Sequence, residues 1–277
     1  MARRLHLIDE PMSRLAAWSR RLALFALAVA ALSILIVRSN ILEIEPALAT
    51  FGAALVFAAL SILLAFAAFV VIWRQGKSGL GAALSGLMLG VLLLAYPAYL
   101  GYRAAKLPPI SDITTDPDNP PRFDFLARLR PADRVAYPGA ATARKQAEAY
   151  PDIVPLQVTA PVRVAYDVTL ALVTKRKWPV AEARPPVGSR RDAVIEATAR
   201  TPIMGFRDDI AIRITPTSEG ARIDMRSASR YGVSDLGTNA ARIRSLLEDI
   251  DDAVGAAPAP RPEPVQKPPP PKRQPKR

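Results

Sequence analysis

Residues 206–242 read FRDDIAIRITPTSEGARIDMRSASRYGVSDLGTNAAR, and this stretch predicts how the folded part of the chain is built. Apolar and polar residues alternate over 210–215 and again over 221–226, which is the pattern of half-buried strands. The turn residues 218–220 join the two segments, so we expect a hairpin with one apolar face and one charged face. From Leu236 onward, apolar residues recur every three or four positions, which predicts an amphipathic helix.

Charged and small polar residues gather where the hairpin gives way to this helix. The candidates for a binding site are Asp208, Asp209, Arg226, Ser229, Arg230, Ser234, Asp235, Asn239 and Arg242. A helix N-terminus surrounded by arginines binds phosphates or carboxylates, so one interpretation is a pocket for an anionic head group on which Arg226, Arg230 and Arg242 converge. In the other interpretation the aspartates pair with the arginines and fix the sheet to the helix, because buried ion networks are often structural. The sequence leaves both interpretations open.

A further interpretation treats Asp208 and Asp209 as the paired carboxylates of a hydrolase that also uses Arg230. Neighbouring side chains of a strand point to opposite faces, so the two carboxylates would share a substrate only if they lay in a turn. No catalytic residue is therefore assigned, and non-enzymatic binding of an anionic ligand or an envelope partner is preferred. A structural scaffold of the cell envelope, which functions through its spans and its tail, is the other alternative.

Composition excludes several kinds of chemistry. The 277 residues include no cysteine and one histidine, His6, which precedes the first apolar run. Without these side chains the domain has no disulfide, no cysteine nucleophile, no Cys/His zinc site and no Ser-His-Asp triad. We expect no metal and no cofactor. Of the net charge of +12, residues 107–255 carry only +1, so nucleic acid is not expected as a partner, and the basic flanks suit an anionic lipid surface.

Three apolar segments predict a membrane anchor. Residues 46–73 and 78–102 contain no charge and are long enough to cross a bilayer, whereas residues 22–37 need help from flanking arginines. Small residues recur at four-residue spacing in the second and third segments, which favours close helix packing within one chain or between copies in a homo-oligomer. Pro97 is expected to kink the third span near its end.

The distribution of Lys and Arg predicts the orientation of this anchor. Residues 1–21 and the second loop together hold seven Lys or Arg, whereas the opposite side of the spans holds three. The excess places the N-terminus in the cytoplasm, and three spans then place the domain outside it. We therefore expect a protein of the bacterial inner membrane with an extracytoplasmic domain, whose partners are the bilayer and either an anionic small molecule or an envelope protein.

The remaining segments complete an α+β domain. Upstream of the hairpin, helices are expected at 140–150 and 161–177, and strands at 154–158, 178–183 and 193–199, with a turn at 185–188. The order β-α-β-β-β-β-α, preceded by the short helix, predicts an antiparallel sheet with helices packed on its apolar face. The predicted organisation is a cytoplasmic N-terminus at 1–21, an anchor at 22–106 with spans near 22–37, 48–73 and 80–102, a solvated Pro/Asp-rich linker at 107–135, the α+β domain at 136–255, and a disordered Pro/Lys/Arg-rich tail at 256–277.

The motif around the predicted site resembles a known family. Phe206-x-Asp-Asp, followed by Arg226-Ser-x-Ser-Arg-x-Gly-x-Ser-Asp-Leu-Gly-x-Asn-x-x-Arg-Ile, is similar to the family called domain of unknown function 1499, and the likeness covers about residues 110–253. The three-span anchor resembles a proteobacterial subgroup. The resemblance implies an envelope setting and no established activity. Many members carry paired cysteines near the domain start, where this chain has residues 116–121 and no cysteine, so a role tied to those cysteines does not transfer.

Overall fold

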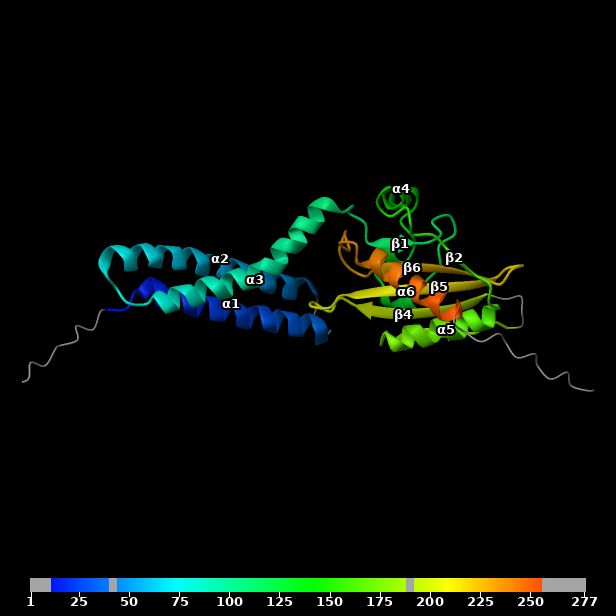
Figure 1. The fold of residues 1–277 in the computed structure, drawn as a ribbon, viewed down its shortest axis with the longest axis horizontal. Coiled ribbons are helices and arrows are strands. Elements are labelled where there is room, and N and C mark those ends of the chain that lie inside the picture. The colour runs from blue at the N-terminus through cyan, green and yellow to red at the C-terminus, as the bar shows by residue number, and fades with distance from the viewer. Residues whose placement is uncertain (1–10, 40–43, 188–191, 256–277) are drawn as a thin grey trace, which may run out of the picture.

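The computed structural model describes residues 11–39, 44–187 and 192–255. Three long helices form one end of an elongated molecule, and a sheet with helices on one face forms the other end (Figure 1). The expected tail at 256–277, the first ten residues of the expected N-terminus, and Gly188 of the expected turn lie outside the described residues. The α+β class, with three apolar helices ahead of an antiparallel sheet, is confirmed.

The three helices pack through their small residues. They are α1 (Arg14–Ser39), α2 (Ile44–Gln75) and α3 (Leu80–Lys106), and all three are long and apolar enough to cross a membrane. The hydroxyl of Ser19 donates to the Ser61 carbonyl at 2.9 Å, and the single hydroxyl hydrogen of Ser61 is shared between the carbonyls of Ser19 and Gly86, each at 3.0 Å. The small residues buried on α2 and α3 include Ala54, Ala58, Ala65, Ala83 and Gly90. These faces are therefore used between helices of one chain, and large apolar side chains point outward.

The C-terminal part of α3 turns away from the bundle in Figure 1. The helix contains Pro97, which lacks the backbone N–H for one helical hydrogen bond and whose ring crowds the preceding turn. Exposed Tyr96, Tyr99 and Tyr102 lie in the same part of the helix. Tyrosines are enriched where a spanning helix meets the head-group region, so this end of α3 fits the membrane surface.

The sheet is antiparallel and has six strands. Its order is β1-β6-β5-β4-β3, and β2 pairs with the other half of β6. The strands are β1 (Asp112–Thr114), β2 (Leu156–Val158), β3 (Val180–Arg184), β4 (Ala193–Arg200), β5 (Arg207–Pro216) and β6 (Ala221–Ser229). In the β5–β6 register Ile212 lies opposite Met225 and Arg213 opposite Asp224, which gives the predicted hairpin one apolar face and one charged face.

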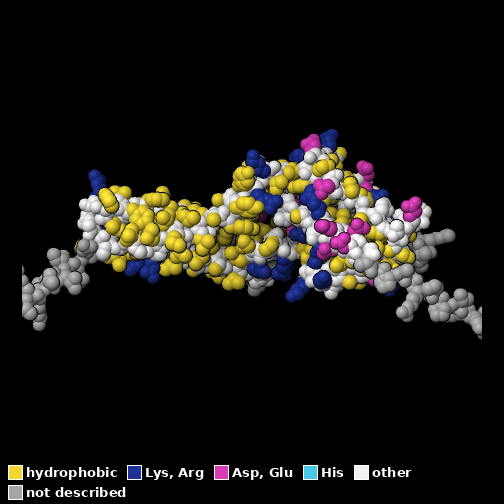
Figure 2. Space-filling model, in the orientation of Figure 1, with side chains coloured by type: hydrophobic (Ala, Val, Ile, Leu, Met, Phe, Trp, Pro, Cys, Tyr) yellow, Lys and Arg dark blue, Asp and Glu magenta, His cyan; other side chains and the backbone are white. Residues whose placement is uncertain are grey.

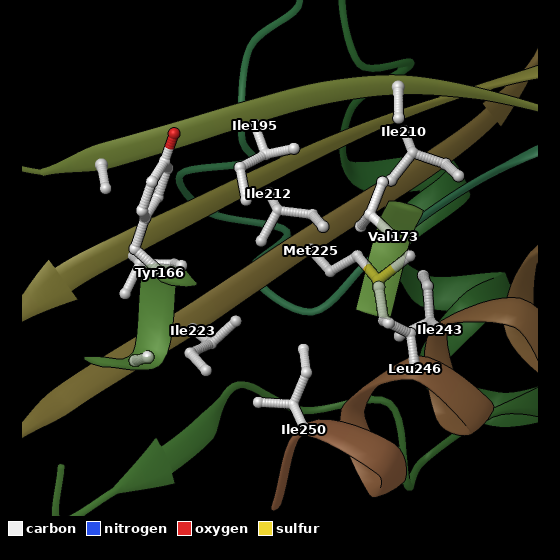
Figure 3. Close-up of a cluster of buried hydrophobic side chains, with 14 of the residues drawn as sticks. Tyr166, Val173, Ile195, Ile210, Ile212, Ile223, Met225, Ile243, Leu246 and Ile250 are labelled. Carbon is white, nitrogen blue, oxygen red and sulfur yellow. The ribbon is translucent and has the colours of Figure 1, made fainter. Parts of the chain in front are cut away.

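The apolar face of the sheet is covered by α5 (Val162–Lys175) and α6 (Thr238–Gly255). Figure 3 shows Val173 of α5 and Ile243, Leu246 and Ile250 of α6 pointing at the isoleucines of the strands and at Met225. Ile243 and Ile250 lie in the stripe that the sequence predicted for α6, whereas Leu246 is fully buried and the expected Leu247 only partly so. The short helix α4 (Ala140–Ala149) also forms where it was expected.

The prediction of a solvated linker at 107–135 is wrong, because this segment packs on the opposite, charged face of the sheet. Ile113 is fully buried in β1, and two short 3₁₀ helices, Leu126–Leu129 and Ala132–Arg134, belong to the segment that crosses the charged face. The carboxylate of Glu196 in β4 accepts the backbone N–H groups of Asp124, Phe125 and Leu126 at 2.7–3.2 Å. Proline and aspartate suggested a solvated segment because they break regular structure, but here side chains of the sheet supply the hydrogen bonds that a ladder would otherwise make.

Asp116, in the same segment, is bound to the sheet as well. Its carboxylate lies 3.3 Å from Arg213 and 2.8 Å from Arg222, both on the charged face of the sheet. In the described part of the chain no group of three or more acidic residues or histidines is arranged to hold a metal ion. The Asp-rich segment therefore balances the charge of the sheet.

Candidate functional site

The N-terminus of α6 already holds a carboxylate of the chain itself. Asp235 accepts the backbone N–H groups of Gly237 and Asn239, at 2.9 and 2.8 Å. The loop reaches this geometry through left-handed backbone at Gly232, Leu236 and Gly237, with φ of 85°, 54° and 78°. Burial raises the pKa of Asp235, while its two backbone hydrogen bonds oppose that rise. The place where the sequence predicted an external anion is thus filled by Asp235.

A second network joins the sheet to α6. Arg242 lies with its guanidinium 2.6 Å from Asp208, and it also donates to Ser227 at 2.8 Å and to Asn239. The amide of Asn239 donates to the hydroxyl of Ser229 at 3.1 Å, and Ser227 donates to Asn239 at 2.8 Å. The network ties β5, β6 and α6 together on the apolar side of the sheet.

A third network lies on the charged side of the sheet. Asp209 is fully buried and accepts from Arg230 at 2.8 and 2.9 Å, from Arg130 at 2.9 Å and from Thr198 at 2.9 Å. Burial lowers the pKa of Arg130, and Asp209 opposes that change. The carboxylate is therefore shared by two cations that reach it from different parts of the chain.

Arg226 is paired on the same side. Its guanidinium makes two hydrogen bonds to Asp112, at 2.9 and 2.7 Å, and lies 4.5 Å from the centre of the Phe123 ring and 5.8 Å from that of Tyr137. Burial raises the pKa of Asp112, and the hydrogen bond from Arg226 is the largest opposing contribution. Burial also raises the pKa of Tyr137 to about 12. Arg226 is thus held in a closed site between an aspartate and two aromatic rings.

The arginines do not converge as the anion-site interpretation required. Arg226 and Arg230 point to the charged face of the sheet, whereas Arg242 binds on the helix-covered face. Asp208 and Asp209 likewise point to opposite faces, as expected for neighbours in a strand. Each of the three arginines has a carboxylate partner at 2.6–2.9 Å.

Sequence reasoning missed four hydrogen-bonding members of these networks. Asp112 and Arg130 lie in the segment interpreted as a linker, and Thr198 and Ser227 lie in strands whose pairing was unknown. The available signal was an unusual number of charged residues beside apolar ones in a Pro-rich segment. That signal does not say which strand the segment covers.

Part of the predicted site does line a cavity, which we call the junction pocket. Its domain wall consists of 201–206 without Gly205, together with Asp208, Ser229, Tyr231, Ser234, Asp235, Leu236 and Thr238. Its other wall is the end of α3, with Tyr96, Tyr99, Leu100 and Arg103. The volume is about 210 Å³, and most of the lining is apolar or aromatic. The pocket therefore brings four residues of the predicted site, Asp208, Ser229, Ser234 and Asp235, against a helix of the anchor.

The loop that forms this wall is docked on the anchor at a second place. Arg38, in the last turn of α1, donates to the carbonyls of Pro202 and Ile203 at 2.8 and 3.0 Å, and Arg200 donates to the Arg38 carbonyl at 3.1 Å. Gly205 has a φ of 74°, and a Cβ there would lie 2.8 Å from the Cγ of Arg38. The close approach of α1 to this loop thus needs glycine.

Two larger cavities lie beside the charged networks. One, of about 300 Å³, includes Asp112 and Arg130 in its lining, and the other, of about 510 Å³, includes Arg226 and Tyr137. In their linings Asp112 is bound to Arg226, and Arg130 to Asp209. Neither cavity is lined by residues of α1, α2 or α3.

The comparisons with known proteins bear on the domain. A family model described as "Protein of unknown function (DUF1499)" matches residues 112–250, half of the chain. The chain belongs to this family. None of the curated proteins and none of the solved structures matches.

The DUF1499 match begins at the first residue of β1, Asp112, and ends at Ile250 in the buried stripe of α6. It therefore includes the segment over the charged face and all three networks, and it leaves out the three apolar helices. In this DUF1499 protein the junction pocket has one wall from the family domain and one wall from the anchor.

Proposed function

We propose that this protein is a membrane-anchored binding protein whose DUF1499 domain lies outside the cytoplasm and takes the apolar part of an amphiphilic ligand into the junction pocket. The observation that supports it best is the composition of the pocket wall. Tyr96, Tyr99 and Leu100 come from a helix apolar enough to cross a membrane, and they face residues of the family motif.

The position of the pocket supports an amphiphile over a fully water-soluble ligand. Tyr96 and Tyr99 are partly exposed near the end of α3, where tyrosines favour the head-group region of a bilayer. A hydrocarbon chain can therefore enter from the bilayer along α3 with little exposure to water. Its transfer is favoured by the hydrophobic effect, about 0.8 kcal/mol for each methylene that leaves water.

The size of the pocket sets how much of the ligand it encloses. About 210 Å³ is below the ~300–1,000 Å³ of pockets that enclose whole drug-sized molecules. The pocket thus suits one segment of a chain, with the head group and the rest of the molecule outside.

Backbone strain in the pocket wall gives further support. Leu236 has a φ of 54°, a conformation that is unfavourable for a residue with a γ-branched side chain. Such strain persists where the surroundings impose it, and it is concentrated at binding sites. Here it turns the Leu236 side chain into the lining of the pocket.

A hydrolase is less well supported. The hydrolase alternative paired Asp208 with Asp209, but the carboxylates that line the pocket are those of Asp208 and Asp235. Asp208 is bound to Arg242, and both oxygens of Asp235 accept backbone N–H groups. Each carboxylate thus has a structural role that limits its access to a substrate.

The topology is tested by fusion. A reporter enzyme that matures only outside the cytoplasm, attached after Arg277, is expected to be active, because the Lys/Arg bias places the N-terminus inside and three spans place the domain outside. The same fusion to a reporter that works only in the cytoplasm should be inactive. The reverse pair of results would contradict the proposed orientation.

Ligand entry is tested by filling the pocket from α3. Leu100→Trp places an indole in the pocket, so labelling of the domain by a phosphatidylcholine with a photoreactive group in its acyl chain should fall about fivefold or more in vesicles. Leu92→Trp is the matched control, since Leu92 lies on the same helix and is 70% exposed. The readout is the label in peptides that contain 201–206 or 229–238, relative to the label on α3 itself. Unlabelled domain peptides in the unmodified protein would contradict the proposal.

A further inference from the structure

We propose that Arg200 and Arg207 form a binding site for the anionic head group of a membrane lipid, at the end of the sheet that faces the anchor and separate from the junction pocket. The two residues lie directly opposite each other in the β4–β5 ladder. Their side chains share the charged face of the sheet, the face of Glu196 and Asp209.

Neither arginine has an acidic partner in the part of the chain that the structure describes. All ion pairs found there use other arginines. The carboxylate on the same face, Asp209, is taken up by Arg230 and Arg130. Like charges directly opposite on neighbouring strands destabilise a sheet, so the pair is placed at a cost that a bound anion would offset.

The guanidinium of Arg207 has N–H donors without an acceptor among the described residues. It is half-buried, and no hydrogen bond joins its side chain to the described residues. Burial lowers the pKa of Arg207, and the nearby charges of Arg230 and Arg200 lower it further. A phosphate beside Arg207 would supply both the missing acceptors and the missing negative charge.

The position of the pair indicates a lipid as the source of that anion. Arg200 donates to the carbonyl of Arg38, the residue that ends the apolar run of α1. The pair therefore lies at the level where α1 leaves the membrane. In Figure 2 dark blue Lys and Arg side chains gather where the yellow helical end meets the domain, whereas the magenta acidic side chains lie on the domain. A basic surface next to a spanning helix attracts anionic lipids.

The test measures lipid selectivity of the full-length protein. The protein is placed in vesicles that contain phosphatidylcholine and phosphatidylglycerol at a ratio of about 3:1. It is then released and analysed by native mass spectrometry for the lipid that it retains. We expect the unmodified protein to enrich phosphatidylglycerol. Because each basic residue near a membrane surface contributes about fivefold, Arg200→Gln with Arg207→Gln should lower the enrichment roughly 25-fold. Arg200→Lys with Arg207→Lys should retain most of it.

Two controls make the result decisive. Arg128→Gln with Arg144→Gln removes the same charge from exposed positions with no ion pair, and it should leave the enrichment unchanged. Equal unfolding temperatures of the Gln and Lys double variants exclude a loss of fold. The proposal is overturned if the unmodified protein shows no enrichment, if the Gln double variant keeps it, or if the control pair loses as much.

Inorganic phosphate distinguishes the source of the anion. Enrichment that survives millimolar phosphate supports a lipid head group as the occupant. Enrichment that phosphate abolishes would show that the arginines take a free anion, and it would overturn the lipid assignment. Entry of acyl chains into the junction pocket is measured separately, so the failure of either proposal leaves the other standing.

Discussion

Asp209→Asn should lower the free energy of unfolding of the domain by about 3–5 kcal/mol, because it leaves the guanidinium groups of Arg130 and Arg230 buried without a counter-charge. Asp209 is fully buried, and the Arg130 and Arg230 side chains are 1% and 6% exposed, so water cannot replace the lost carboxylate. For a domain of this size the loss corresponds to about 10 °C in the unfolding temperature. Circular dichroism of the full-length protein during heating measures it.

Asp167→Asn is the matched control for this change. Asp167 pairs with Arg163 on the surface of α5, and both side chains are more than half exposed. Exposed pairs of this spacing contribute about 0.3–0.5 kcal/mol, so the control should unfold close to the unmodified protein. If Asp209→Asn also unfolds close to the unfolding temperature of the unmodified protein, the network is not structural. Arg230 then becomes a candidate for binding an external anion again.

Gly86→Leu should separate the three apolar helices α1, α2 and α3. A Cβ at this position would lie 2.0 Å from the hydroxyl of Ser19, and 2.8 and 2.9 Å from backbone atoms of Ser19 and Arg20. Backbone atoms cannot move aside as the end of a side chain can, so α1 and α3 must separate, and the hydrogen bonds among Ser19, Ser61 and Gly86 are lost. Overpacking costs about 1–3 kcal/mol, and each lost hydrogen bond between spanning helices about 0.6 kcal/mol.

Gly81→Leu provides the comparison in the same helix, because a Cβ at Gly81 meets nothing within 4 Å. Heat-induced aggregation in detergent should begin at a clearly lower temperature for Gly86→Leu and at an unchanged temperature for Gly81→Leu. A different outcome would contradict the packing of this face within one chain: Gly86→Leu keeps the thermal stability of the unmodified protein, but the unmodified protein is a dimer and the variant is a monomer. The small-residue face would then serve association between copies.

Together, the two variants separate the two parts of the molecule. Asp209 stabilises the domain through charge, and Gly86 stabilises the anchor through close packing in an apolar environment. The junction pocket lies between these parts, so its geometry depends on both remaining folded. Binding experiments on pocket variants therefore need an unfolding measurement beside them.

Local pattern was enough for much of the fold. Charge-free stretches predicted the three apolar helices, alternation predicted β5 and β6, and the stripe ending at Ile250 predicted α6. These patterns repeat over neighbouring residues, because one side of each element faces solvent or lipid and the other side faces the protein. They can therefore be recognised without information on contacts between distant parts of the chain. The family motif was also visible, and six of its residues line the junction pocket.

The partners of the charged residues could not be predicted in the same way. Asp209 meets Arg130 across 79 positions, and Arg226 meets Asp112 across 114. Such pairs depend on which strand borders which and in what register, and shifting a strand by one residue would move every side chain to the other face. The Pro-rich segment at 107–135 has no alternation of apolar and polar residues, so its sequence did not indicate that it covers the sheet.

The sequence by itself determined that this chain has three helices apolar enough to cross a membrane and a nearly neutral α+β domain of the DUF1499 family, since composition and periodicity are properties of the chain alone. The tertiary structure decided that the arginines of the motif are bound to carboxylates of the same chain and that the end of α3 closes a pocket against the motif loop. The physical reason is that a buried charge must be paired and a cavity needs two walls, and in both cases the second member comes from a distant part of the chain.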